Sequence, residues 1–146
     1  MPKHPTFAGD FLKLILNATA ITNLAVNASS SPVTNLYLSL HTADPGPSGN
    51  QTTSEAAYTS YARVAVARTS GGWTVTVSGH TTTVSPVADI TFPAATGGSE
   101  TELYAGIGTA SSGSGYLLWS GILHEKIIVT SGITPKIKSF STLTET

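Results

Sequence analysis

The chain has 146 residues, a formal net charge of −1 and no cysteine, and only 10% of its residues are charged. This length fits one domain with a hydrophobic core. The balanced charge gives no reason to expect nucleic acid or an anionic membrane as a partner. The absence of cysteine excludes disulfides and cysteine metal sites. The 23 threonines, 18 serines, 14 glycines and 8 prolines favour strands and turns, and so predict an all-β protein.

The first residues carry Pro2 and Pro5, which disfavour helix and predict an extended arm over residues 1–9. Asp10 then fits the cap of a short helix that ends near Asn17. The apolar residues expected to share one helix face are Phe11, Leu14, Ile15 and Ala18, with Leu12 and Leu16 beside them. Neither an apolar run of membrane-spanning length nor the apolar core of a signal peptide is present.

A strand is predicted at residues 36–41, where leucines alternate with Tyr37, Ser39 and His41. A polar loop rich in proline and glycine follows over residues 43–60, and strand character resumes at 61–66. A loop of this length exceeds what a compact domain usually needs, and such loops are often functional. We therefore expect the arm and this loop to carry much of the contact with other molecules.

Alternating or apolar segments bounded by turns predict the remaining strands, at residues 73–78, 81–84, 88–92, 103–108, 116–122, 126–130 and 135–143. Residues 116–122 are mostly apolar, so this strand is expected to be covered on both faces, with Trp119 buried between sheets. About eight strands predict a two-sheet sandwich or jelly roll with a short N-terminal helix. The predicted organisation is the arm followed by a single β-sandwich domain over residues 10–146.

The sequence offers no arrangement of residues suited to catalysis or metal binding. The four histidines have no second ligand at a recognised spacing, and neither a Gly-x-Ser-x-Gly turn nor a phosphate-binding glycine loop occurs. Glu100 and Glu102 can share a strand face, where mutual repulsion predicts a solvated rim. A glycan hydrolase would need two opposed carboxylates, which different strands can still supply. We expect no enzyme activity, no metal and no cofactor.

Surface aromatic and proline residues are the remaining candidates for contact with a partner. Trp73 follows two glycines and is the better candidate for an exposed platform that binds sugar. The residues predicted to take part in interactions are Phe7, Asp44, Pro45, Pro47 and Trp73.

Five segments in a fixed order resemble a family of small structural proteins of tailed bacteriophages, loosely labelled tail-fibre or minor structural proteins. The segments are residues 36–46 (LYLSLHTADPG), 61–66 (YARVAV), 91–95 (TFPAA), 106–123 (GIGTASSGSGYLLWSGIL) and 132–135 (GITP). Each motif alone is weak, whereas their order and spacing together are fairly specific. The resemblance extends over about residues 10–140.

The resemblance implies a β-sandwich with an N-terminal helix, made in the bacterial cytoplasm and carried in the virion. Our leading hypothesis is a capsid decoration (cement) protein whose partners are the major capsid protein and copies of itself, in a homotrimer. The alternative is a tail-fibre or receptor-binding module, whose partner would be a glycan or protein of the host surface. Neither hypothesis includes nucleic acid or a membrane as partner.

Overall fold

The computed structural model describes residues 5–21 and 32–145. The described residues group into two compact units, and each is described by itself. The helix unit draws on segments 1–35, 66–89 and 138–146, whereas the hairpin unit draws on segments 36–65 and 90–137. The sequence predicted a single domain after the arm.

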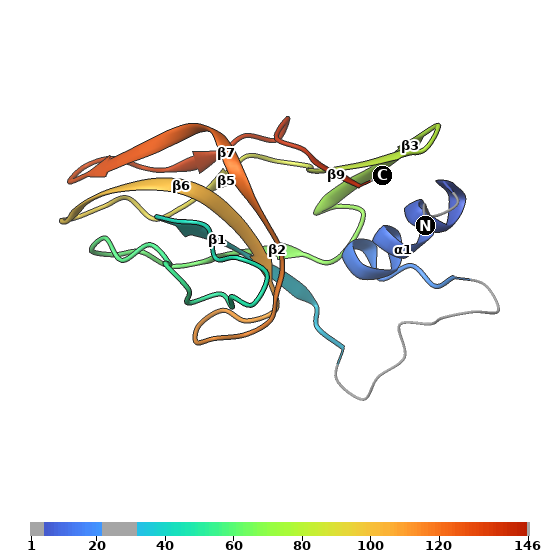
Figure 1. Cartoon of the computed structure of the whole chain (residues 1–146), viewed down its shortest axis with the longest axis horizontal. Helices are drawn as coiled ribbons and strands as arrows, with labels where there is room; N and C mark the ends of the chain where they lie inside the picture. Colours follow the sequence, from blue (N-terminus) through green and yellow to red (C-terminus); the bar gives the residue numbers. More distant parts are fainter. Residues whose placement is uncertain (1–4, 22–31, 146) are drawn as a thin grey trace. The chain divides into compact units, whose positions relative to one another are not determined.

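The described residues form one helix and nine strands (Figure 1). The elements are α1 (Pro5–Asn17), β1 (Asn35–His41), β2 (Val64–Ala67), β3 (Trp73–Ser78), β4 (Thr81–Pro86), β5 (Ile90–Thr91), β6 (Ser99–Gly108), β7 (Leu117–Thr130), β8 (Lys136–Ile137) and β9 (Leu143–Glu145). The sheets have the strand orders β2-β1-β6-β7, β3-β4-β9 and β5-β8. This confirms an all-β fold with a short N-terminal helix, whereas the two-sheet sandwich or jelly roll stays a prediction.

Helix α1 begins within the predicted arm. Residues 5–9 are helical, so the extended conformation predicted for them is wrong, and residues 1–4 lie outside the described part of the chain. Pro5 occupies the first helical position, where its missing N–H has no partner to lose and its fixed φ suits the helix. The helix ends at Asn17 as predicted, and Ala18 follows with a φ of 54°.

The buried face of α1 also differs from the predicted one. Ala8, Leu12 and Leu16, spaced four residues apart, have exposed fractions of 2%, 0% and 0%. The four residues predicted to form this face are only partly buried. The helix packs against β3 and β4, and a Cβ at Gly9 would lie 2.3 Å from Cγ2 of Val77 on β3. Gly9 is itself buried, so α1 approaches β3 closely at this residue.

Strands β3 and β4 form the predicted hairpin through the two-residue turn Gly79–His80. Ser78 pairs with Thr81, and Gly79 takes the φ of +57° that this kind of turn favours. Trp73 is only 2% exposed, so the prediction of an exposed tryptophan is wrong. It shares a face of β3 with Val77, and that is the face against which α1 packs.

Strands β6 and β7 run antiparallel beside each other in the hairpin unit (Figure 1). Strand β7 joins two segments that the sequence separated, and nine of its 14 residues are exposed. Because so many of its side chains are exposed, the prediction of a strand covered on both faces is wrong. The strand also forms one edge of its sheet. Trp119, predicted to be buried between sheets, is only partly buried.

Strand β1 lies inside the four-stranded sheet and is covered on both faces. On one face, Leu36, Leu38 and Leu40 have exposed fractions of 2%, 4% and 0%. Burying each leucine contributes about 1.5–3 kcal/mol. The opposite face carries Ser39 and His41, which are both fully buried although they are polar. The sheet therefore packs an apolar layer on one side and a polar layer on the other.

Candidate functional site

The polar layer lies over two glycines of β6. Gly106 pairs with Ser39, and a Cβ at this position would lie 2.8 Å from both Ser39 Oγ and His41 Nε2. A Cβ at Gly108 would lie 2.1 Å from Cδ of Gln51. Glycine at these two positions makes the room in which the polar side chains are buried.

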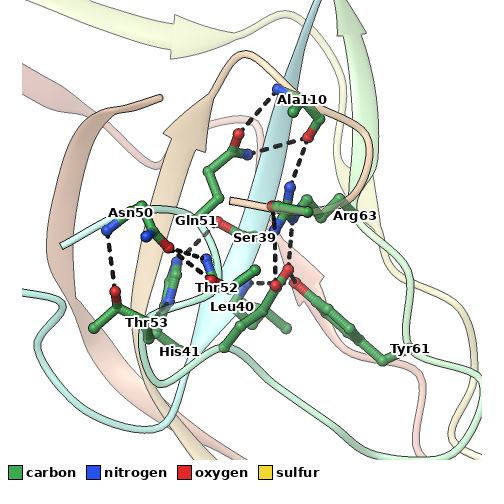
Figure 2. A network of polar contacts seen from close by, with 12 residues as sticks. Ser39, Leu40, His41, Asn50, Gln51, Thr52, Thr53, Tyr61, Arg63 and Ala110 are labelled. Carbon is green, nitrogen blue, oxygen red and sulfur yellow. Dashed lines mark hydrogen bonds and ion pairs between the residues drawn. The ribbon is translucent and has the colours of Figure 1, made fainter. Parts of the chain in front are cut away.

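Gln51 fastens the long loop over residues 43–60 to the β6–β7 connection (Figure 2). Its side chain is fully buried and makes two hydrogen bonds with the backbone of Ala110. Nε2 donates to the carbonyl oxygen at 3.3 Å, and Oε1 accepts from the amide nitrogen at 2.9 Å. The Gln51 amide nitrogen also donates to the Ser114 carbonyl at 2.8 Å. The amide thus satisfies backbone groups that the strand ladder leaves open.

Arg63 binds both Glu55 of the loop and the backbone of the β6–β7 connection. Nε and Nη2 donate to the two carboxylate oxygens of Glu55 at 2.6 and 2.8 Å, which is a bidentate ion pair. Nη1 and Nη2 also donate to the carbonyls of Ala110 and Gly113, at 2.9 and 2.7 Å. The Arg63 side chain is 2% exposed and that of Glu55 is 15% exposed. A charge buried to this extent is tolerated because it is paired with a carboxylate and makes four hydrogen bonds.

Ser39 and His41 form a hydrogen bond of 2.8 Å between Oγ and Nε2. Nδ1 of His41 lies 2.9 Å from the Thr53 carbonyl, which can only accept, so Nδ1 carries the hydrogen and Nε2 accepts from the serine. This is the geometry of a nucleophile beside a base, yet both side chains are 0% exposed. Burial lowers the pKa of His41, which favours the neutral ring. Both side chains are shielded from solvent in this conformation, and His41 joins β1 to the loop through the Thr53 carbonyl.

Glu100 and Glu102 project from one face of β6, and only one of them lies at a rim. Oε1 of Glu100 accepts hydrogen bonds from the amides of Ala57 and Tyr58, at 2.9 and 2.7 Å. Glu102 is fully buried, so the prediction that both lie at a solvated rim is wrong. Among the described residues, neither of its oxygens has a hydrogen-bond partner. Burial first, and then the charge of Glu100, raise the pKa of Glu102 to about 8.

Tyr58 lies close to these two acids and is itself buried. Its hydroxyl donates to the Pro93 carbonyl at 3.0 Å. Burial and the charges of Glu102 and Glu100 raise the pKa of Tyr58 to about 12.

In the described segments, no three histidine or acidic side chains gather as ligands for a metal ion. Helix α1, the one helix in residues 5–21 and 32–145, is too short to cross a membrane.

The residues predicted to interact fall into both units. Asp44, Pro45 and Pro47 lie together in the loop, where Oδ1 of Asp44 accepts from the Gly46 amide at 2.9 Å and shapes a turn. Asp44 and Pro47 are exposed, whereas Pro45 is buried. Phe7 lies on α1 with 41% of its surface exposed, and Trp73 is buried. Their contact with a partner stays a prediction.

A group of exposed apolar side chains was missed by the sequence analysis. Within residues 5–21 and 32–145, five of the eleven large hydrophobic residues that are exposed lie on or beside β6 and β7, namely Leu103, Tyr116, Leu118, Ile122 and Ile128. The apolar run in this part of the sequence predicted a buried strand. The charged pair Glu125–Lys126 within β7 was the available sign of an exposed strand.

A family model described as podophage GP4 fiber I protein gp80 matches residues 14–144. The match includes the polar network, the acid pair and all of β7, and it excludes the first nine residues of α1. No curated protein matches the chain.

Proposed function

Because the chain belongs to the family of the podophage GP4 fiber I protein gp80, we propose that it is a structural subunit of a phage fibre. The family match over nearly the whole chain carries this proposal. In the fibre, the protein would contact either neighbouring fibre subunits or a glycan or protein of the host surface.

The geometry of the hairpin unit suits a mechanical role. The loop over residues 43–60 is held by a bidentate ion pair, a buried histidine and a buried glutamine. Together these contacts fix the position of the loop backbone that carries its exposed side chains. Rigid loops lose little conformational entropy when they bind a partner. Asp44 and Pro47 are exposed on this loop and are our candidates for partner contact. We propose no catalytic role, since the Ser39–His41 pair is buried.

Capsid decoration is the second candidate, and the low charge of the chain favours it. With 10% charged residues, the surface can be buried against a shell lattice with little desolvation of charge. Its partners would be the major capsid protein and copies of this chain, in the homotrimer expected from the sequence.

The number and place of copies in purified particles distinguish the two candidates. Quantitative mass spectrometry against the major capsid protein should give a few dozen copies or fewer for a fibre subunit, and hundreds for a decoration protein. Gold-labelled antibody should mark the tail end of the particle in the first case and the whole shell in the second. Hundreds of copies spread over the shell would refute the fibre assignment.

A further inference from the structure

The connection between β6 and β7 is longer than a hairpin needs, and buried side chains hold its backbone (Figure 2). It spans residues 109–116, whereas most hairpin loops have about 2–5 residues. Arg63 donates to two of its carbonyl groups, at 2.9 and 2.7 Å. Gln51 bonds to its backbone at Ala110 and at Ser114. A buried cation and a buried amide therefore fix the shape of a loop that lies at the surface.

The side chains of the same connection are free to meet another molecule. Residues 111–116 are all exposed, and Tyr116 has an exposed fraction of 78%. Among the described residues, no hydrogen bond is made by the hydroxyl groups of Ser111, Ser112, Ser114 and Tyr116. A tyrosine ring and free hydroxyl groups thus stand on a fixed backbone, which loses little conformational entropy when a partner binds.

This part of the chain carries no charge of its own. Residues 103–123 contain no aspartate, glutamate, lysine or arginine. Arg63, which bonds to the connection, is buried and is paired with Glu55. Nucleic acids and anionic membranes bind to basic surfaces, so this surface suits a neutral partner better.

The side chains of the connection also indicate the chemistry of that partner. We propose that residues 111–116 bind a neutral polysaccharide of the host surface, with Tyr116 against the apolar face of a sugar ring and serine hydroxyls bonded to the sugar hydroxyls. Tyrosine combines an apolar ring with a polar tip, and serine offers adaptable hydrogen bonds. Interfaces between proteins are instead depleted in serine and alanine, which supply four of the eight residues of the connection.

This inference rests on the proposed fibre role, in which the chain meets the host surface, but the two claims are tested separately. Copy number and place in the particle decide the role, whereas binding by the purified chain decides the surface. A tail location without binding to a neutral polysaccharide would refute this surface alone. A shell location would refute the fibre role, and the polysaccharide result would still stand.

An array of bacterial neutral polysaccharides, anionic polysaccharides and outer-membrane proteins tests the surface with the purified full chain. We expect binding to neutral polysaccharides. For the polysaccharide that is bound most tightly, calorimetry should give a dissociation constant that changes by less than about twofold between low and high salt, because screening acts on charged partners.

Variants of the connection should then locate the contact. Tyr116→Ala should raise the dissociation constant about tenfold, because aromatic anchors often dominate the energy of a binding site. Tyr116→Phe should keep most of the affinity, because the ring remains. Ser112→Ala should raise the dissociation constant about threefold through the loss of one hydrogen bond. Phe140→Ala is the matched control, since it removes a ring that is 80% exposed and lies in the helix unit, and it should change nothing.

Several outcomes would overturn the proposal. Binding confined to anionic polysaccharides or to proteins would do so, as would no binding to the array at all. Equal affinities for the natural chain and Tyr116→Ala would also overturn it, and so would a loss in Phe140→Ala as large as that in Tyr116→Ala. Circular dichroism and the melting temperature of each variant verify that the fold is kept, which substitutions at exposed positions should allow.

Discussion

Replacing Glu102 with glutamine should remove a loss of stability that the natural protein undergoes as the pH rises. Glu102 is fully buried on β6, and neither carboxylate oxygen has a hydrogen-bond partner among the described residues. Burial, followed by the charge of Glu100, raises its pKa from an ordinary value of 4.5 to about 8. The folded state therefore favours the neutral carboxyl group, which glutamine imitates in size and charge.

The direction of this pH effect follows from comparing the ionisation of Glu102 in the folded and the unfolded chain. Below pH 4.5 the carboxyl group is protonated in both the folded and the unfolded chain, so it carries no penalty. Between pH 4.5 and about 8 the unfolded chain ionises first, so the free energy of unfolding falls as the pH rises. A change in pKa of this size is equivalent to roughly 3–5 kcal/mol. Above pH 8 the E102Q variant should exceed the natural protein in stability by an amount of that order.

Urea unfolding of both proteins at a series of pH values measures this effect. The difference between the two free energies isolates residue 102 and the groups coupled to it, Glu100 and Tyr58, because titrating groups elsewhere contribute equally to both proteins. His41 is one such group, since its lowered pKa makes stability fall as the pH drops through 6.5, opposite to the trend of Glu102. Glu125→Gln, at an exposed position of β7, is the matched control and should change little. If natural protein and E102Q lose stability equally between pH 4.5 and 8, the carboxyl group is not buried as described.

Three further changes test the packing by urea or thermal unfolding. Gly108→Ala should cost about 1–3 kcal/mol of stability, because the new Cβ would overlap the buried side-chain amide of Gln51. Gly121→Ala should be nearly neutral, because no atom lies within 4 Å of its new Cβ. Equal costs for the two variants would contradict this packing. Trp73→Ala should cost about 3–5 kcal/mol and Trp119→Ala clearly less, since only the first is 2% exposed; the reverse order would refute this assignment. Deletion of residues 2–8 should lower the melting temperature, because it removes the first turn of α1; an unchanged temperature would indicate a free arm.

Composition and local patterns were sufficient for the class of fold and for several elements. Alternating leucines predicted β1, and alternation after two glycines predicted β3 with its bounds. The β6–β7 hairpin followed from the serine- and glycine-rich stretch at residues 111–115. These signals are local, because side-chain alternation and turn residues act within a few positions of the chain. The order of the phage motifs likewise indicated the family that the match over residues 14–144 identifies.

The candidate site depended on contacts between distant residues and was not predicted. Gln51 meets Ala110, and Arg63 meets Glu55 and Gly113, with no pattern in the sequence that pairs them. The glycines of β6 that make room for these side chains read as ordinary strand residues. Their partners arrive from the loop over residues 43–60, which composition alone marked only as long and polar.

The sequence by itself indicated the all-β class and located strands such as β1 and β3, because alternation and turn chemistry are properties of neighbouring residues. Only the tertiary structure decided which faces are covered, because burial depends on what another segment brings to that face. Trp73 is buried on the face of β3 against which α1 packs, while Ile122 and Ile128 of β7 stay exposed because no described segment covers them. Glu102 is likewise fully buried, and its burial could not be predicted because a charged residue in a sequence does not show which segments will fold over it.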